Sequence, residues 1–203
     1  MIVQLSVMER ELVRKLVHLL ILGVLPVLAY SPWIALLSLS FGSIIYILSE
    51  QYRIERISRC HHGTCFTPIH RVTVLLAREQ ERSDIVWAPI SLAVGAMITI
   101  ALFPQPLSHI GILALALGDT AALIGGKVLK GPLLPFTREK HLSGFVSCWI
   151  VCAAVVWVYT GHFWAALTAG AAAAAAESLQ VRNGDNILLP LAVALVTDFW
   201  VCF

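Results

Sequence analysis

Charged side chains are scarce in this chain of 203 residues, where they make up only 13% of the sequence. Hydrophobic residues account for 59% of it, and the mean hydropathy is +0.84. Soluble proteins carry about 25% charged residues, and a compact domain of this composition would lack the polar side chains needed to cover its surface. The scarcity of charge therefore excludes a soluble enzyme. A net charge of +2 is also too small to indicate a nucleic-acid partner.

Two familiar nucleotide-binding patterns are absent. The stretch that ends in Gly126 and Lys127 has Val128 where a P-loop requires Ser or Thr, and Ala121 where it requires its first glycine. The signature set of the protein kinases is missing as well. A nucleotide-dependent reaction in this chain would therefore need another binding scheme.

Long apolar stretches occupy most of the chain. A helix needs about 20 apolar residues to span a bilayer, and shorter helices can be accommodated by local thinning of the membrane. The seven candidate stretches are residues 16–30, 32–49, 85–103, 107–128, 142–160, 163–177 and 187–203. The sequence therefore predicts an all-α, polytopic integral membrane bundle of about seven transmembrane helices, folded as one domain over residues 1–203. Within it, the alanine-rich run of residues 169–176 indicates a helix that packs closely on its neighbours.

The positive charges are distributed unevenly between the predicted loops. Every Lys and Arg lies in or next to the amino-terminal segment and the loops of residues 50–84, 129–141 and 178–186, which alternate to one side of the membrane. The turns on the other side carry no charge. Because cytoplasmic loops carry the excess of Lys and Arg, we expect seven spans with the amino terminus inside and the carboxyl terminus outside. The membrane would be the cytoplasmic one in a prokaryote and an endomembrane in a eukaryote.

Two of the five cysteines lie in the predicted cytoplasmic loop of residues 50–84. A structural disulfide between Cys60 and Cys65 is not expected on the reducing side of the membrane. Together with His61, His62 and His70, they offer enough ligand types for zinc, but their spacing fits no usual zinc-finger pattern. We interpret this segment as a solvated loop rather than a metal site.

Charged residues at the start of the first apolar stretch form a first candidate cluster. It contains Glu11, Arg14, Lys15 and His18. Arg14 and His18 are four residues apart and share one face of a helix, and Lys15 can pair with Glu11. The alternative is an anchor whose long side chains extend to the membrane interface.

A second cluster lies in the fourth apolar stretch, where a carboxylate is costly and by default marks a functional site. Asp119 precedes Lys127 by about 12 Å along a helix, too deep for hydration from the loop without a cavity. The neighbouring glycines allow a ligand to approach the backbone, and the nearby cations suit phosphate. The alternative is a structural Asp bonded to a neighbouring helix. The cluster comprises Gly118, Asp119, Thr120, Gly125, Gly126, Lys127, Lys130, Arg138, Lys140 and Gly144.

A third cluster lies at the predicted turn between the last two stretches. It contains Glu177, Ser178, Asp185 and Asn186. Asp185 and Asn186 stand where a helix would begin, so helix capping is one interpretation. Acidic and amide oxygens beside a cationic loop are also ligands that Mg²⁺ accepts when it is shared with phosphates. All three clusters open to the same side of the membrane, which suits a reaction between a soluble nucleotide and a lipid.

Four short segments carry a resemblance to a known family. They are residues 11–18 (ELVRKLVH), 118–126 (GDTAALIGG), 140–144 (KHLSG) and 177–190, which begins with ESL and ends with DNILLP. In this order the sequence resembles the CTP-dependent lipid-alcohol kinases, which include dolichol kinase, phytol kinase and the yeast-type diacylglycerol kinase. It differs from the common family pattern at His141 and Ser143. The resemblance implies an integral membrane enzyme that uses a divalent metal to transfer the terminal phosphoryl group of CTP to the hydroxyl of a lipid.

Together, the clusters and the resemblance suggest roles for individual residues. We expect Asp119 and Asp185 to hold Mg²⁺, with Glu177 and Asn186 in or near its coordination shell. The proton acceptor for the lipid hydroxyl is Asp119, Asp185 or His18, and the sequence leaves this choice open. The residues expected to bind the nucleotide are Arg14, Lys15, Gly118, Thr120, Gly125, Lys127, Lys140 and Gly144.

Two other functions remain compatible with the sequence. A membrane cytidylyltransferase would use the same CTP, metal and location but would transfer CMP and release pyrophosphate. A small transporter would also contain buried charges, although here they gather at one leaflet. The acceptor lipid is expected to be diacylglycerol or a polyisoprenoid alcohol such as polyprenol or phytol.

Overall fold

The computed structural model describes residues 15–16, 18–59, 85–129, 131–135, 137, 140–179 and 184–201. Regular structure within these ranges is helical, apart from an isolated β-bridge between Leu133 and His141. The first described residues form a short helical segment that contains Lys15 and His18 and leads into a 3₁₀ turn, η1. The helices are η1 (Leu20–Gly23), α2 (Val24–Tyr30), α3 (Pro32–Arg59), α5 (Ala88–Leu102), α6 (Leu107–Val128), α7 (Leu142–Thr160), α8 (Phe163–Ser178) and α9 (Asp185–Val201). The predicted all-α class is confirmed.

The helices follow the predicted apolar stretches in order. α6 and α7 begin and end at the predicted residues. α3 instead continues for 28 residues, well into the segment predicted as a loop. By length and composition, three helices can cross a membrane: residues Pro32–Glu55 of α3, α6 and α7. These long apolar helices are compatible with a membrane protein, while the count of seven spans stays a prediction.

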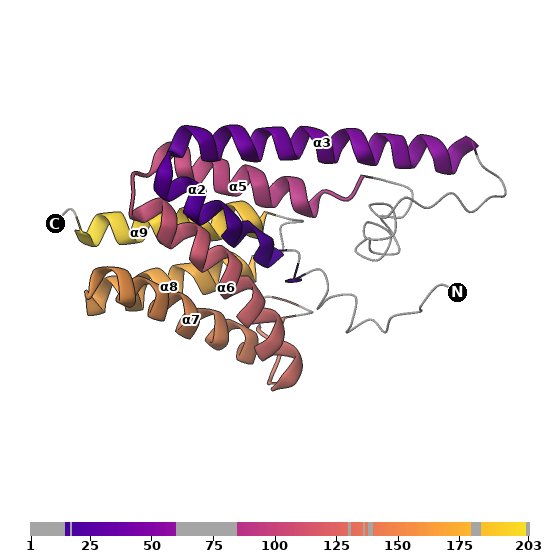
Figure 1. Ribbon diagram of the computed structural model, residues 1–203. Coiled ribbons are helices and arrows are strands. Elements are labelled where there is room, and N and C mark those ends of the chain that lie inside the picture. The colour runs from indigo at the N-terminus through magenta and orange to yellow at the C-terminus, as the bar shows by residue number, and fades with distance from the viewer. Residues whose placement is uncertain are drawn as a thin grey trace.

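The helices alternate in direction across a bundle. The turns that join α2 to α3, α5 to α6 and α7 to α8 lie at one end, on the left in Figure 1. At the other end, α6 finishes, α7 begins, α8 finishes and α9 begins. The described residues of the three predicted clusters therefore lie at this second end of the molecule or within a few helical turns of it.

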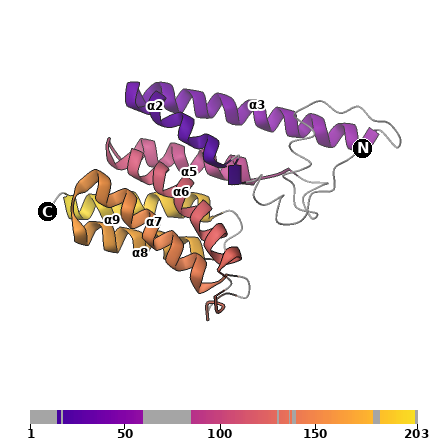
Figure 2. The ribbon, with the colours of Figure 1, turned by 60° about the horizontal axis from the view of Figure 1, so that its bottom comes forward.

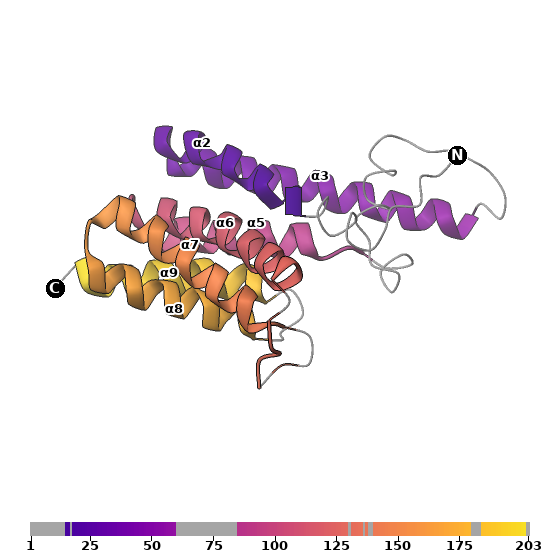
Figure 3. The ribbon, with the colours of Figure 1, turned by 90° about the horizontal axis from the view of Figure 1, so that it is seen from below.

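Helices α6, α7, α8 and α9 form the closely packed part of the bundle, since each packs on the next and α9 packs back on α6. α5 packs on α9, and α3 packs on α5. Figures 2 and 3 show α2 and α3 as an outer layer, with α5 and α6 between this layer and α8. Helix α6 is thus central, which explains why so many of its side chains are buried.

Small residues permit this close packing. The alanine-rich α8 buries Ala169, Ala173 and Ala174 completely, as expected for a helix that lies close to its neighbours. A Cβ at Gly144 of α7 would lie 2.7 Å from the carbonyl oxygen of Ala122 on α6. The absence of side chains at such positions lets the backbones approach where larger residues would separate them.

Replacing Gly95 by Ala is expected to lower the thermal stability of the detergent-solubilised protein. Gly95 lies on α5 against the start of α9, and its Cβ would lie 2.2 Å from the carbonyl oxygen of Asn186. Because this neighbour is backbone, the helices must move apart, and such overpacking typically costs about 1–3 kcal/mol.

The matched control is Gly42→Ala on α3, where nothing lies within 4 Å of the new Cβ. This change should leave the melting temperature unaltered or raise it, because alanine favours a helix by up to about 1 kcal/mol over glycine. Equal melting temperatures for the two variants would contradict the packing of α5 on α9.

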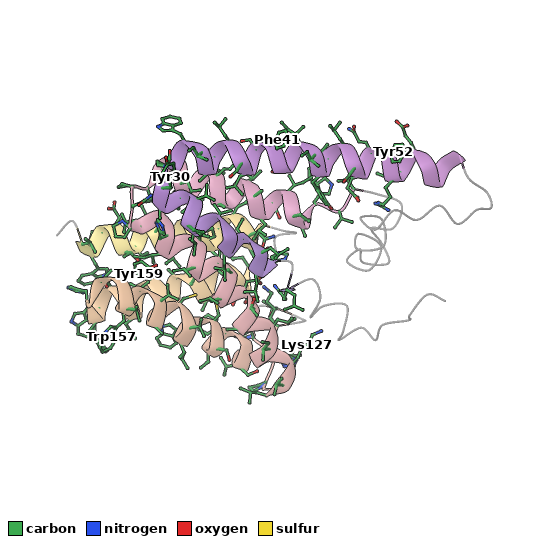
Figure 4. The ribbon with its side chains drawn as sticks, viewed as in Figure 1. Tyr30, Phe41, Tyr52, Lys127, Trp157 and Tyr159 are labelled. Carbon is green, nitrogen blue, oxygen red and sulfur yellow. The ribbon has the colours of Figure 1, made fainter. Side chains whose placement is uncertain are left out.

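The surface of the bundle is largely apolar. Phe41 and Tyr52 on α3, labelled in Figure 4, are among many large exposed side chains. Tyr30, Trp157 and Tyr159 are exposed at the end with the short turns, whereas Lys127 lies towards the other end. Aromatic side chains collect at the interfaces of membrane proteins, and the exposed aromatic residues at the end with the short turns are compatible with one such interface.

Candidate functional site

Asp119 lies on the central helix α6 and is almost completely buried. Its carboxylate pairs with the ammonium group of Lys15, which is also buried and lies 104 positions away in the sequence. The short segment that carries Lys15 leads into η1, and η1 packs on α6. The first and second predicted clusters therefore meet, and each charge provides the partner that a buried charge requires.

Glu177 lies in the last turn of α8 and is buried. The ammonium group of Lys140 donates to the carboxylate of Glu177 at 2.8 Å and also to the backbone carbonyl oxygen of Glu177. The last carbonyl groups of a helix lack partners within the helix, and a lysine can satisfy them. Lys140 thus links the segment before α7 to the end of α8, which joins the second predicted cluster to the third.

The two ion pairs belong to one electrostatic neighbourhood. The negative charges of Asp119 and Asp185 both lie close enough to the carboxylate of Glu177 to repel its negative charge. The charges of Glu177 and Asp119 in turn both act on the thiol of Cys148, which is buried on α7. Asp119 on α6 and Asp185 on α9 therefore both lie within electrostatic range of Glu177 on α8, and a metal site shared by these carboxylates stays a prediction.

Asp185 and Asn186 begin helix α9. The backbone N–H of Asn186 donates to the carboxylate of Asp185 at 2.9 Å, so Asp185 satisfies one of the N–H groups that a helix start leaves without a helical partner. The buried side-chain amide of Asn186 donates to the hydroxyl of Ser91 at 2.8 Å and to the carbonyl of Ala88 at 3.4 Å. Asn186 therefore fixes α9 to α5 and holds Asp185 in its position.

Other predicted site residues have varied surroundings. His18 is buried in the same short helical segment as Lys15. The hydroxyl of Thr120 donates to the carbonyl oxygen of Ala116 at 2.7 Å, within α6. Lys127 lies in the last turn of α6. Arg14 and the neighbouring Glu11, like the segment from Cys60 to His70, lie outside the described residues.

The predicted glycines lie at the contact between α6 and α7. A Cβ at Gly125 would lie 2.0 Å from the hydroxyl oxygen of Ser147, and one at Gly118 would lie 2.4 Å from the sulfur of Cys152. Gly144 faces α6 from the opposite side of the same contact. Helix packing therefore explains these glycines, and their place beside a nucleotide stays a prediction.

The carboxylate set can be compared with the needs of a metal ion. No group of three or more His, Cys, Asp and Glu residues that could hold one is found among the described residues. Mg²⁺ is usually held by only one or two carboxylates, with water and substrate phosphates as its other ligands. A cation held by Asp119 and Asp185 would therefore need water and the phosphates of a substrate to complete its coordination.

A third ion pair, which was not predicted from the sequence, joins the buried side chains of Glu50 and Arg53 on α3. The guanidinium group of Arg53 donates to the carboxylate at 2.8 Å and 3.0 Å, and the N–H of Val86 donates to the same carboxylate at 3.3 Å. Tyr46 donates to the carbonyl oxygen of Val86 at 3.0 Å. These contacts fasten α3 to the chain that enters α5. Opposite charges three residues apart were the signal that could have indicated the pair.

Comparisons with known proteins give one relative of nearly the same length. No protein-family model matches the chain, and no solved structure matches it. An uncharacterized protein of Methanocaldococcus jannaschii is 26% identical over 198 residues, an alignment that covers 93% of each chain. The likeness therefore extends over most of the chain and assigns it no activity.

Proposed function

We propose that the chain is an integral membrane kinase that transfers the γ-phosphoryl group of CTP to the hydroxyl of a lipid alcohol, with Mg²⁺ as the divalent cation. The observation that carries this proposal is the buried pair of Lys15 and Asp119 in the same neighbourhood as the pair of Lys140 and Glu177. Charges inside an apolar bundle are costly and mark functional sites by default. CTP as the donor comes from the resemblance to the lipid-alcohol kinases.

The arrangement supplies the two kinds of charge that phosphoryl transfer requires. Catalysis of this reaction consists mainly of positioning the reactants and stabilising negative charge on the phosphates. Asp119 and Asp185 would hold Mg²⁺, which would supply positive charge to offset the charge of the phosphates. In the structure Lys15 forms an ion pair with Asp119, and Lys140 forms one with Glu177. When the nucleotide is bound, we expect these lysines to bind its phosphate oxygens instead, together with Arg14 and Lys127.

The lipid hydroxyl must lose a proton as the phosphoryl group is transferred. Asp119, Asp185 and His18 remain the candidate acceptors. Asp119 and His18 are both buried, and His18 shares its helical segment with Lys15, the partner of Asp119. The apolar surroundings would keep water away from the phosphoryl group, which favours the lipid over hydrolysis.

The proposed enzyme crosses the membrane seven times, with its amino terminus and active site on the cytoplasmic side. The alternating helices, the aromatic residues at one end and the Lys and Arg residues towards the other support this topology. Helices α5, α8 and α9 have 15, 16 and 17 residues, or about 22–26 Å at 1.5 Å per residue. They would require local thinning of a hydrocarbon core of about 30 Å.

Incubating the purified protein with γ-labelled CTP, Mg²⁺ and an acceptor is expected to place the label in the lipid. Diacylglycerol, polyprenol and phytol should be compared as acceptors, and ATP should be compared with CTP as the donor. Label in pyrophosphate would show a cytidylyltransferase instead. Solute flux in proteoliposomes without nucleotide, combined with no transfer to any acceptor, would show a transporter.

A further inference from the structure

The segment between α6 and α7 is closed at its base by hydrogen bonds to a single glycine. The backbone N–H of Gly131 donates to the hydroxyl of Ser143 at 3.3 Å, and the ring nitrogen Nδ1 of His141 lies 2.6 Å from the carbonyl oxygen of Gly131. A carbonyl oxygen can only accept, so Nδ1 carries the proton in this contact. Both backbone polar groups of Gly131 are therefore bound by side chains from the start of α7.

The side chain of His141 is not used to begin α7. His141 directly precedes the helix, and its side chain makes no capping hydrogen bond to it. The backbone N–H groups of Gly144 and Phe145 donate to the carbonyl oxygen of His141. The imidazole ring is therefore left to hold the opposite side of the segment through Gly131.

Lys140 lies within this closed segment, and its backbone is held from both sides. The N–H of Leu134 donates to the carbonyl oxygen of Lys140 at 2.9 Å, and the hydroxyl of Thr137 donates to the same oxygen at 3.3 Å. Shortly after Lys140, the N–H of Leu142 donates to the carbonyl oxygen of Pro132 at 2.8 Å. The position of the Lys140 backbone therefore depends on the segment staying closed.

The position of this backbone decides where the ammonium group of Lys140 can reach. The ammonium group donates to the carboxylate and to the backbone carbonyl oxygen of Glu177 at the end of α8. Ordering a long lysine side chain costs conformational entropy, and a mobile backbone would add to that cost. The side chain of Lys140 is still 26% exposed, so a solute can reach it.

We propose that His141 and Ser143 are positioning residues for Lys140: by binding Gly131 they keep the segment closed and hold the ammonium group of Lys140 beside Glu177. The resemblance to the lipid-alcohol kinases assigns neither side chain a role, because these are the two positions that differ from the common pattern. The consequence for catalysis rests on the proposed function, in which Lys140 binds the phosphates of CTP. Loosening the segment should then raise the KM for CTP and change kcat less, because saturating CTP compensates for weaker binding.

The rate at which an amine reagent acylates Lys140 tests the proposal without any enzymatic activity. The detergent-solubilised full-length chain is treated with acetic anhydride, and the modified lysines are quantified by mass spectrometry. An ammonium group held by a carboxylate and a carbonyl oxygen reacts slowly, so release of Lys140 from Glu177 should accelerate its acylation. The rate at Lys127, on α6, serves as the internal reference and should not change.

Three variants change the bonds to Gly131 in different ways. His141→Gln moves the donor from the position of Nδ1 to that of Nε2, and Ser143→Ala removes the acceptor hydroxyl. Each should accelerate the acylation of Lys140 about threefold or more, since the loss of one hydrogen bond typically changes an equilibrium by at least about that factor. His141→Asn should restore the slow rate, because its amide places an N–H near the position of Nδ1.

His162→Gln is the matched control, since His162 also directly precedes a helix, α8, at the other end of the bundle. It should leave the rate at Lys140 unchanged, even where the loss of its cap on Ala165 lowers the melting temperature. If His141→Gln fails to fold, Ser143→Ala decides. Slow acylation in both His141→Gln and Ser143→Ala, or equally fast acylation in His141→Asn and His141→Gln, would overturn the proposal. Failure of the proposed function is distinct, because it appears as no label transfer from CTP by the unaltered protein while the acylation rates still respond to the variants.

Discussion

Replacing Asp119 by Asn is expected to lower phosphoryl transfer at least about 100-fold, because general acid–base catalysis alone typically contributes a factor of about 10²–10⁴. The substitution keeps the size of the side chain and removes its negative charge. The proposed site would lose a ligand for Mg²⁺ and one candidate for the proton acceptor. The measurement is the rate of label transfer from γ-labelled CTP to the lipid, relative to the unaltered protein.

The same substitution leaves Lys15 buried opposite a neutral side chain, since the two groups form an ion pair. Breaking a buried pair by removing one partner costs about 3–5 kcal/mol, so a loss of activity could reflect a loss of folding. Adding Lys15→Met to Asp119→Asn removes the unpaired charge, because a neutral replacement of both partners is often tolerated. The double variant should regain most of the melting temperature and none of the activity.

These outcomes separate a catalytic role for Asp119 from a structural one. If the double variant regains both stability and activity, the pair of Lys15 and Asp119 is structural and the proposed mechanism is wrong. If Asp119→Asn alone retains near-normal activity, Asp119 takes no part in the chemistry. Asp198→Asn on α9 provides a control for the loss of an Asp elsewhere in the same bundle.

The sequence predicted helices α6 and α7 to the residue because their apolar stretches have sharp ends. α6 begins directly after Pro106, and α7 is followed by Gly161, which adopts a left-handed conformation with φ of 64°. α3 was predicted too short because polar residues follow Ser49. The helix tolerates these residues because Glu50 and Arg53 form an ion pair three residues apart, and the N–H of Val86 donates to Glu50, so that the cost of burying both charges is offset.

The partners of the charged residues could not be predicted in the same way. A helix that is apolar on all sides carries no pattern to show which face meets which neighbour. Lys15 was expected beside Glu11 or a phosphate, whereas the structure places it on Asp119, and Lys140 on Glu177. The glycines at 118, 125 and 144 were predicted to make room for a ligand, whereas in the structure they make room for the facing helix. Sequence spacing does not distinguish these two kinds of close approach.

The pair of Lys140 and Glu177 gives a second test, in which the two partners are expected to have different effects. Replacing Glu177 by Gln removes a negative charge from the region shared with Asp119 and Asp185. We expect the Mg²⁺ concentration for half-maximal activity to rise about tenfold, which corresponds to about 1.4 kcal/mol. Replacing Lys140 by Gln leaves that negative charge in place and removes a cation, so the Mg²⁺ requirement should stay the same or fall. Its expected effect is a rise of about tenfold in the KM for CTP.

A purely structural pair would behave differently, because loss of either partner would then disturb the same contact between α8 and the segment before α7. In that case both variants would lower the melting temperature by a similar amount. They would not differ in the Mg²⁺ concentration for half-maximal activity or in the KM for CTP. Glu50→Gln is the matched control, since Glu50 is a buried carboxylate with a partner at 2.8 Å, the same distance as between Lys140 and Glu177. It should lower the melting temperature and leave the half-saturating concentrations of Mg²⁺ and CTP unchanged. A similar rise in the Mg²⁺ requirement in Glu177→Gln and Glu50→Gln would show that the effect comes from lost folding and not from the site.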